Sequence, residues 1–263
     1  EPNNALAWGR IAELHLMTGN LNDALAAASK ATALNPNLAR TQSVLGIVYL
    51  AQIKTKHARQ AFEQAITLDQ ADPLPRLGLG LAKIRDGDLA AGREEIEIAT
   101  ALDPNNALVR SYMGKAYYEE KRDPLAATQF DIAKTLDPKD PTPWFYDAIL
   151  KQSTNRPVEG LQDLQKSIEL NDNRAVYRSR LLLDQDQAAR SASLARIYND
   201  LGFDRLAQIE ASKSLDTDPT NHAAHRFLSD SYGGRPRHEI ARASELLQAQ
   251  LLQPLSLYLA QPQ

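Results

Sequence analysis

A proline that returns at a fixed interval constrains the fold of this chain more than any other feature. Pro2, Pro36, Pro104 and Pro138 lie 34 residues or a multiple of 34 apart, and Gln70 takes the place between the second and the third. The last three follow Asn or Asp. That combination ends a helix, because proline lacks an amide hydrogen and the residue before it favours a turn. A regular interval of this length indicates a chain of stacked, similar units.

The residues between the prolines repeat as well. The unit 107–140 carries Gly114 at its eighth place, Tyr117 at its eleventh, Ala126 at its twentieth and Phe130 at its twenty-fourth, and the other units keep many of these residue types. Small residues at the eighth and twentieth places let two helices approach closely, while the aromatic residues fill the space between units. This pattern resembles the tetratricopeptide repeat, whose unit is a pair of antiparallel helices.

The resemblance implies an all-α fold, a right-handed superhelical solenoid of antiparallel helix pairs with about seven repeats in a single domain, residues 1–263. The repeats are expected at 5–38, 39–72, 73–106, 107–140, 141–174, 188–221 and 222–255. Residues 175–187 fall outside the period. We expect an irregular insertion there, which is either a kink in the superhelix or a partner-specific feature.

Two further features concern the parent protein. Residues 1–4 read as the end of an earlier repeat, so we expect the protein to extend upstream, with an N-terminal cap as the alternative. Residues 173–254, with strings such as ARSASLARIYNDLGFDRLA, resemble repeat blocks of large Gram-negative envelope proteins that precede a predicted outer-membrane barrel. That resemblance implies a periplasmic or outer-membrane-associated location, with a cytoplasmic or extracellular location as the alternative.

Composition narrows the classes of function. The formal net charge is −3, from 30 basic and 33 acidic residues, which argues against a nucleic-acid partner held by phosphate contacts. The chain has no cysteine, which excludes disulfides, thiolate metal ligands and cysteine nucleophiles within it. No apolar run approaches the roughly 18 residues of a membrane span.

Candidate chemical sites are weak. The sequence has no phosphate-binding glycine loop, nucleophile elbow or zinc-protease helix motif. Gly78 and Gly80 fall inside a repeat helix, where close packing explains them better than a ligand does. His222 and His225 are three residues apart and His238 follows, but no acidic partner is compelling, so solvated or capping roles are favoured. We therefore expect no enzyme activity, no cofactor and no metal.

The family resemblance also implies a binding surface, because the first helix of each repeat lines the concave face of the solenoid. An apolar and aromatic groove with a polar end is expected there, formed by Ile47, Leu81, Tyr112, Lys115, Tyr118, Phe145, Tyr146, Ile149 and Arg196. Two alternatives stay open for these side chains: contact with a partner, or burial by the superhelix itself.

The groove lacks the two-carboxylate clamp of the chaperone-binding relatives. Gly9 and Glu13 stand where those relatives have Lys and Asn. We therefore predict a scaffold that binds another kind of peptide or protein segment, in a bacterial envelope, secretion or polysaccharide-export assembly. The alternatives are a structural subunit that associates end to end into a filament, and a carbohydrate-binding solenoid in which aromatic residues stack on sugar rings.

Overall fold

The computed structural model describes residues 3–170 and 186–233, and its regular structure there is entirely helical. The helices are α1 (Ala5–Met17), α2 (Leu21–Leu34), α3 (Ala39–Ala51), α4 (Thr55–Leu68), α5 (Pro73–Arg85), α6 (Leu89–Leu102), α7 (Ala107–Glu119), α8 (Asp123–Leu136), α9 (Pro141–Ser153), α10 (Pro157–Leu170), α12 (Asp186–Asp200), α13 (Asp204–Thr217) and α14 (His222–Gly233). The expected all-α fold of stacked helix pairs is confirmed.

The first helix of each of the first five pairs begins 34 residues after the one before it, at residues 5, 39, 73, 107 and 141. Side chains at the N-caps explain several of these starts. Asn4, Asp72, Asn106 and Asp140 each accept a hydrogen bond from a backbone N–H of the first turn, which satisfies a donor that has no partner within the helix.

The turn inside each pair uses one left-handed residue. Glycine takes this place in three turns, because a left-handed backbone favours glycine: Gly19 has φ of 76°, Gly87 of 96° and Gly202 of 81°. The equivalent turns of the second, fourth and fifth pairs place Ile53, Lys121 and Asn155 at φ of 62°, 60° and 60°. These three turns keep the same geometry because the packed helices on either side impose it.

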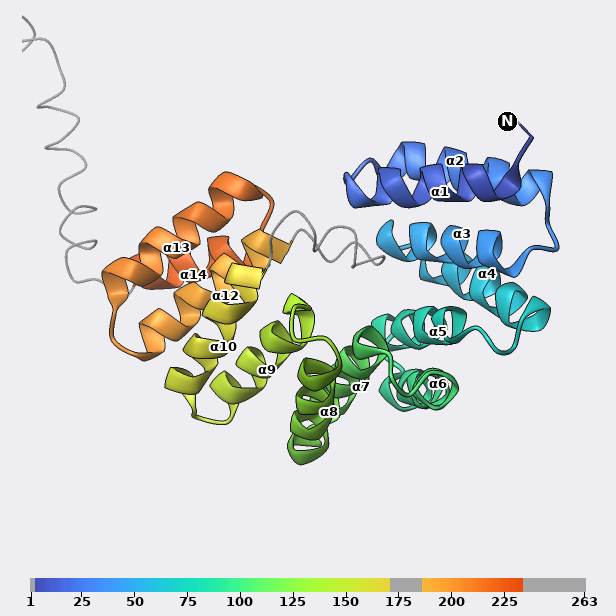
Figure 1. Cartoon of the computed structure of the whole chain (residues 1–263). Helices are drawn as coiled ribbons and strands as arrows, with labels where there is room; N and C mark the ends of the chain where they lie inside the picture. Colours follow the sequence, from blue (N-terminus) through green and yellow to red (C-terminus); the bar gives the residue numbers. More distant parts are fainter. Residues whose placement is uncertain (1–2, 171–185, 234–263) are drawn as a thin grey trace, which may run out of the picture.

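The helix pairs stack into a curved solenoid (Figure 1). Successive first helices touch along its length, α1 with α3, α3 with α5, α5 with α7 and α7 with α9, while the second helices contact chiefly the first helices on either side. This asymmetry makes the first-helix side the inner, concave side. It therefore places the predicted groove residues on one face.

Close approach at glycine sets the spacing of the stack. A Cβ atom on Gly46 or on Gly78 would lie within 3 Å of the Phe62 ring, and a Cβ on Gly114 would meet the Phe130 ring in the same way. The buried apolar residues form two clusters, one spanning α1 to α5 and the other spanning α5 to α12. The clusters meet on α5, where Leu79 belongs to the first and Leu77 to the second.

Some predictions fall on parts of the chain that the structure does not describe. Residues 175–185 of the expected insertion lie outside the described residues, and residues 186–187 begin α12. Residues 234–255 of the expected last repeat also lie outside, as do residues 1–2. The division of the whole chain into one domain with seven repeats stays a prediction. Within residues 3–170 and 186–233, no helix is long and apolar enough to cross a membrane.

Candidate functional site

The concave face carries a row of side chains, one from each of five first helices, α3, α5, α7, α9 and α12. Ile47, Leu81, Lys115 and Ile149 occupy the ninth place of four successive first helices, and Arg196 occupies the corresponding place on α12. Ile47 is buried, the next three are half-buried, and Arg196 is exposed. The row therefore becomes more accessible toward the C-terminal end of the described solenoid.

The predicted aromatic residues of the groove are largely buried by one another. Tyr112, Phe145 and Tyr146 are 2 %, 8 % and 9 % exposed. The Tyr146 ring centroid lies 6.1 Å from that of Tyr112, 5.4 Å from that of Phe145 and 6.4 Å from that of Phe130. Burial by the chain itself, one of the two alternatives, therefore accounts for these three residues and for Ile47.

The accessible part of the concave face is a shorter strip on α5, α7 and α9. We call Leu81, Lys115, Tyr118 and Ile149, all half-buried, the concave strip. The Lys115 ammonium lies 3.2 Å from a carboxylate oxygen of Glu119, which balances its charge. The strip therefore presents mainly apolar and aromatic surface, which suits apolar side chains of a partner.

The strip ends in a polar cavity of about 310 Å³ between α9, α12 and α14. The cavity is lined by Gln152, Arg196, Asn199, Asp200, Phe227, Asp230 and Ser231. Gln152 donates a hydrogen bond of 2.9 Å to the Asp200 carboxylate, while Arg196 forms no ion pair with any described residue. Sequence reasoning missed Gln152, although it stands at the twelfth place of its helix, as Tyr118 does.

Charged side chains join the two helices within a repeat, and sequence reasoning missed them too. Lys83 lies 2.8 Å from Glu95, and Lys151 lies 2.5 Å from Asp163. Both lysines stand at the eleventh place, where the family has tyrosine, and both acids follow 12 residues later. That spacing is the sequence signal that would have found them.

The pKa of the buried acids reflects these contacts. Burial alone would raise the pKa of Glu95, but hydrogen bonds from Lys83 and from Arg76, the latter at 2.7 Å, outweigh burial and lower it below the ordinary value. Burial also raises the pKa of Asp147, but the hydrogen bond from Lys134 lowers it. The second effect is larger, so the pKa of Asp147 lies below its ordinary value. Glu95 and Asp147 therefore stay ionised beside their cations and have the character of structural ion pairs. Burial instead raises the pKa of Asp163 above its ordinary value, although Lys151 and Lys134 lie beside it.

The histidines do not assemble a metal site in the described residues. A ring nitrogen of His225 lies 2.8 Å from the Pro219 carbonyl oxygen, a local contact at the start of α14. No group of three potential ligands occurs within residues 3–170 and 186–233, and His238 lies outside them.

Comparison with known proteins agrees with the fold. Residues 77–141 match the model of the tetratricopeptide repeat family. Anaphase-promoting complex subunit 3 of Schizosaccharomyces pombe is 27 % identical over 173 residues, which are 66 % of this chain and 24 % of that protein. Anaphase-promoting complex subunit CDC16 of Saccharomyces cerevisiae is 23 % identical over 145 residues, which are 54 % of this chain and 17 % of that protein.

A solved structure extends the similarity over most of the chain. The crystal structure of the APC/C hetero-tetramer Cut9–Hcn1 superposes with a TM-score of 0.70 at 17 % identity, covering 88 % of this chain and 43 % of that one. The chain therefore has a tetratricopeptide-repeat fold. It spans about a quarter or less of the two curated relatives.

Proposed function

We propose that this chain is a scaffold that holds a segment of a partner protein along its concave strip. The observation that carries the proposal is the run of half-buried apolar and aromatic side chains on three consecutive first helices, Leu81 on α5, Tyr118 on α7 and Ile149 on α9. A partner that covers these groups removes apolar surface from water, which is favourable at about 25 cal/mol per Å². No proton-transfer or nucleophilic group is needed for this role.

A random-peptide display library selected on the purified chain tests the proposal. We expect the selected peptides to be rich in apolar residues. Tyr118→Ala and Leu81→Asp should each weaken their binding by at least about tenfold, because both side chains lie on the strip.

The control is Leu125→Ala on α8, an exposed leucine on a second helix. Its replacement should leave peptide binding unchanged. Equal binding by Tyr118→Ala, Leu81→Asp and the unaltered chain would contradict a concave site. Tyr146→Ala is unsuitable as a test, because Tyr146 is buried and its loss would disturb folding.

We infer that the scaffold works inside a larger assembly. Two curated relatives are named as subunits of one complex, which supports this inference. The resemblance of residues 173–254 to envelope repeat blocks favours a bacterial envelope, secretion or polysaccharide-export assembly, at the periplasmic side or the outer membrane. Fractionation of cells that make the full-length protein tests this location, and recovery in the cytoplasm would count against it.

End-to-end self-association is a second candidate, favoured by the exposed outer side of α1. Leu14 is 43 % exposed there, whereas Val48, at the same place of the next first helix, is fully buried. A second copy stacked on α1 would bury Leu14. Sedimentation velocity tests this candidate, because Leu14→Asp should abolish any concentration-dependent association. The carbohydrate-binding alternative stays a prediction.

A further inference from the structure

The outer face of α13 differs from that of every earlier second helix. Three positions of each second helix face away from the stack: the residue just before the helix, and the residues three and six places after that one. All of these residues are exposed except Ala91, which is half-buried. The earlier sets are mostly polar: Asn20, Asp23, Ala26; Lys54, His57, Gln60; Asp88, Ala91, Glu94; Arg122, Leu125, Thr128; and Arg156, Glu159, Gln162. The set on α13 consists of three large apolar residues, Phe203, Leu206 and Ile209.

These three residues, here called the α13 stripe, are 52 %, 46 % and 51 % exposed. A single exposed leucine such as Leu125 is ordinary on a protein surface, but three adjacent apolar groups indicate a surface that another molecule covers. The Phe203 ring packs edge-on against the Tyr198 ring at 6.4 Å, so its position is fixed in advance of binding. The five equivalent sets show that the fold itself does not require apolar residues at these places.

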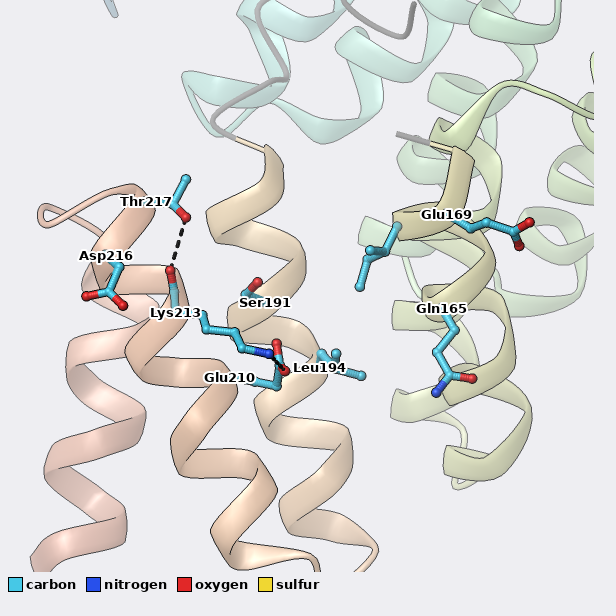
Figure 2. A pocket seen from close by; sticks show the side chains of 9 residues that line it. Gln165, Glu169, Ser191, Leu194, Glu210, Lys213, Asp216 and Thr217 are labelled. Atoms are coloured by element: carbon cyan, nitrogen blue, oxygen red, sulfur yellow. Dashed lines mark hydrogen bonds and ion pairs between the residues drawn. The ribbon is translucent and has the colours of Figure 1, made fainter. Parts of the chain in front are cut away.

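The stripe leads into a cavity of about 560 Å³ between α10 on one side and α12 and α13 on the other (Figure 2). Leu206 and Ile209 are each followed four residues later, on the same side of the helix, by a residue of the cavity wall, Glu210 and Lys213.

The lining of the cavity is acidic and partly apolar. It consists of Gln165, Ile168, Glu169, Ser191, Leu194, Glu210, Lys213, Asp216 and Thr217. Three of these residues carry a carboxylate, and that of Glu169 lies 3.0 Å from the Lys166 ammonium. The Lys213 ammonium lies 2.6 Å from Glu210 and is neutralised by it, whereas Asp216 has no ion pair with any described residue. Ser191 is 9 % exposed, at the edge between the buried and the half-buried residues. A cationic group with an apolar stem fits this lining, because its charge would meet the Asp216 carboxylate and its stem would lie beside Ile168 and Leu194.

We propose that the α13 stripe and the adjoining cavity form a second docking surface, for a partner's amphipathic helix that lays apolar side chains on Phe203, Leu206 and Ile209 and inserts a lysine or arginine side chain into the acidic cavity. This surface lies on the second-helix side of the solenoid. It is therefore independent of the concave strip, and both surfaces can be occupied at once.

A synthetic amphipathic helix of about five turns, with leucines along one face and arginines beside them, serves as the probe. A matched peptide carries glutamate in place of each arginine. We expect the arginine peptide to bind, with amide protection appearing in α13, and the glutamate peptide to bind at least about tenfold more weakly. Asp216→Asn should reduce the preference for arginine without removing the stripe.

The matched variant of the chain is Phe203→Arg with Leu206→Glu and Ile209→Gln, which gives α13 the residues that stand at the equivalent places of α10. These residues are already compatible with the fold there, and we expect the variant to fold and to lose binding by at least about tenfold. Leu125→Glu on α8 and Tyr118→Ala on the concave strip should leave binding unchanged.

Three outcomes would overturn the proposal. The first is equal binding of the arginine peptide to the triple variant and to the unaltered chain. The second is a loss of binding in Tyr118→Ala, which would place the peptide on the concave strip instead. The third is a dimer of the unaltered chain that the triple variant converts to a monomer, which would make a second copy the occupant of the stripe.

Discussion

At the scale of single residues, the spacing of the solenoid depends on positions where an aromatic ring closes against bare backbone. A Cβ on Gly114 would lie 2.5 Å from Cε1 of Phe130, and nine in ten real Cβ contacts are longer than 3.4 Å. Gly9, also inside a first helix, has no such neighbour, because a Cβ there would lie 3.8 Å from the Thr41 methyl group. The same substitution should therefore act in opposite directions at the two sites.

We expect Gly114→Ala to lower the free energy of unfolding by about 1–3 kcal/mol, because the added methyl group forces the Phe130 ring out of place. Gly9→Ala should raise it by up to about 1 kcal/mol, the ordinary gain of alanine over glycine in a helix. Urea denaturation of the two variants checks both signs. A stabilised Gly114→Ala would mean that the ring can move aside without loss.

At the scale of helices, α5 and α6 are joined by an acid that two cations from one helix surround. Glu95 on α6 receives hydrogen bonds from Arg76 and Lys83 on α5, and its side chain is 13 % exposed. The pKa of Glu95 is lower in the folded chain than its ordinary value, because these hydrogen bonds outweigh the effect of burial. Unfolding therefore takes up a proton as the pH falls.

The stabilisation from Glu95 should be complete above the ordinary pKa of glutamate, about 4.3, and should be lost as the pH falls further, through the lowered pKa of the folded chain. We expect Glu95→Gln to reduce the free energy of unfolding by about 1–3 kcal/mol at pH 7, and the difference from the unaltered chain to shrink in acid. Urea denaturation across this pH range measures the difference. Glu94→Gln, next in sequence but largely exposed, should show little effect at any pH.

At the scale of the whole molecule, each described helix pair packs only against its neighbours, so damage should stay local. Phe130 is fully buried on α8, in the cluster that spans α5 to α12. Phe130→Ala should cost about 3–5 kcal/mol and should remove hydrogen-exchange protection from α7 to α10 before α1 and α2 lose theirs. Leu125→Ala on the same helix, at an exposed position, should change neither quantity.

The sequence was sufficient for the repeat and for the all-α fold, because glycine, alanine and proline at fixed places report the backbone directly. The sequence indicated which residues lie on the concave face, but not how deeply each of their side chains is buried. Tyr112, Phe145 and Tyr146 were expected to line a groove, yet the depth of each depends on the rings of neighbouring helices. The ion pairs escaped notice for the same reason, although the 12-residue spacing of Lys83 and Glu95 was visible. Comparison of Phe203 with Arg156, at the same place in its repeat, would have revealed the α13 stripe.

The contact of each helix pair with its neighbours alone has a mechanical consequence. A chain of this construction held at both ends carries load in series, so the weakest junction yields first while the others stay folded. Each helix pair that unfolds would release 34 residues, which span about 110 Å when fully extended. Such a protein can extend under force in separate steps, while a partner bound to another part of the solenoid stays bound.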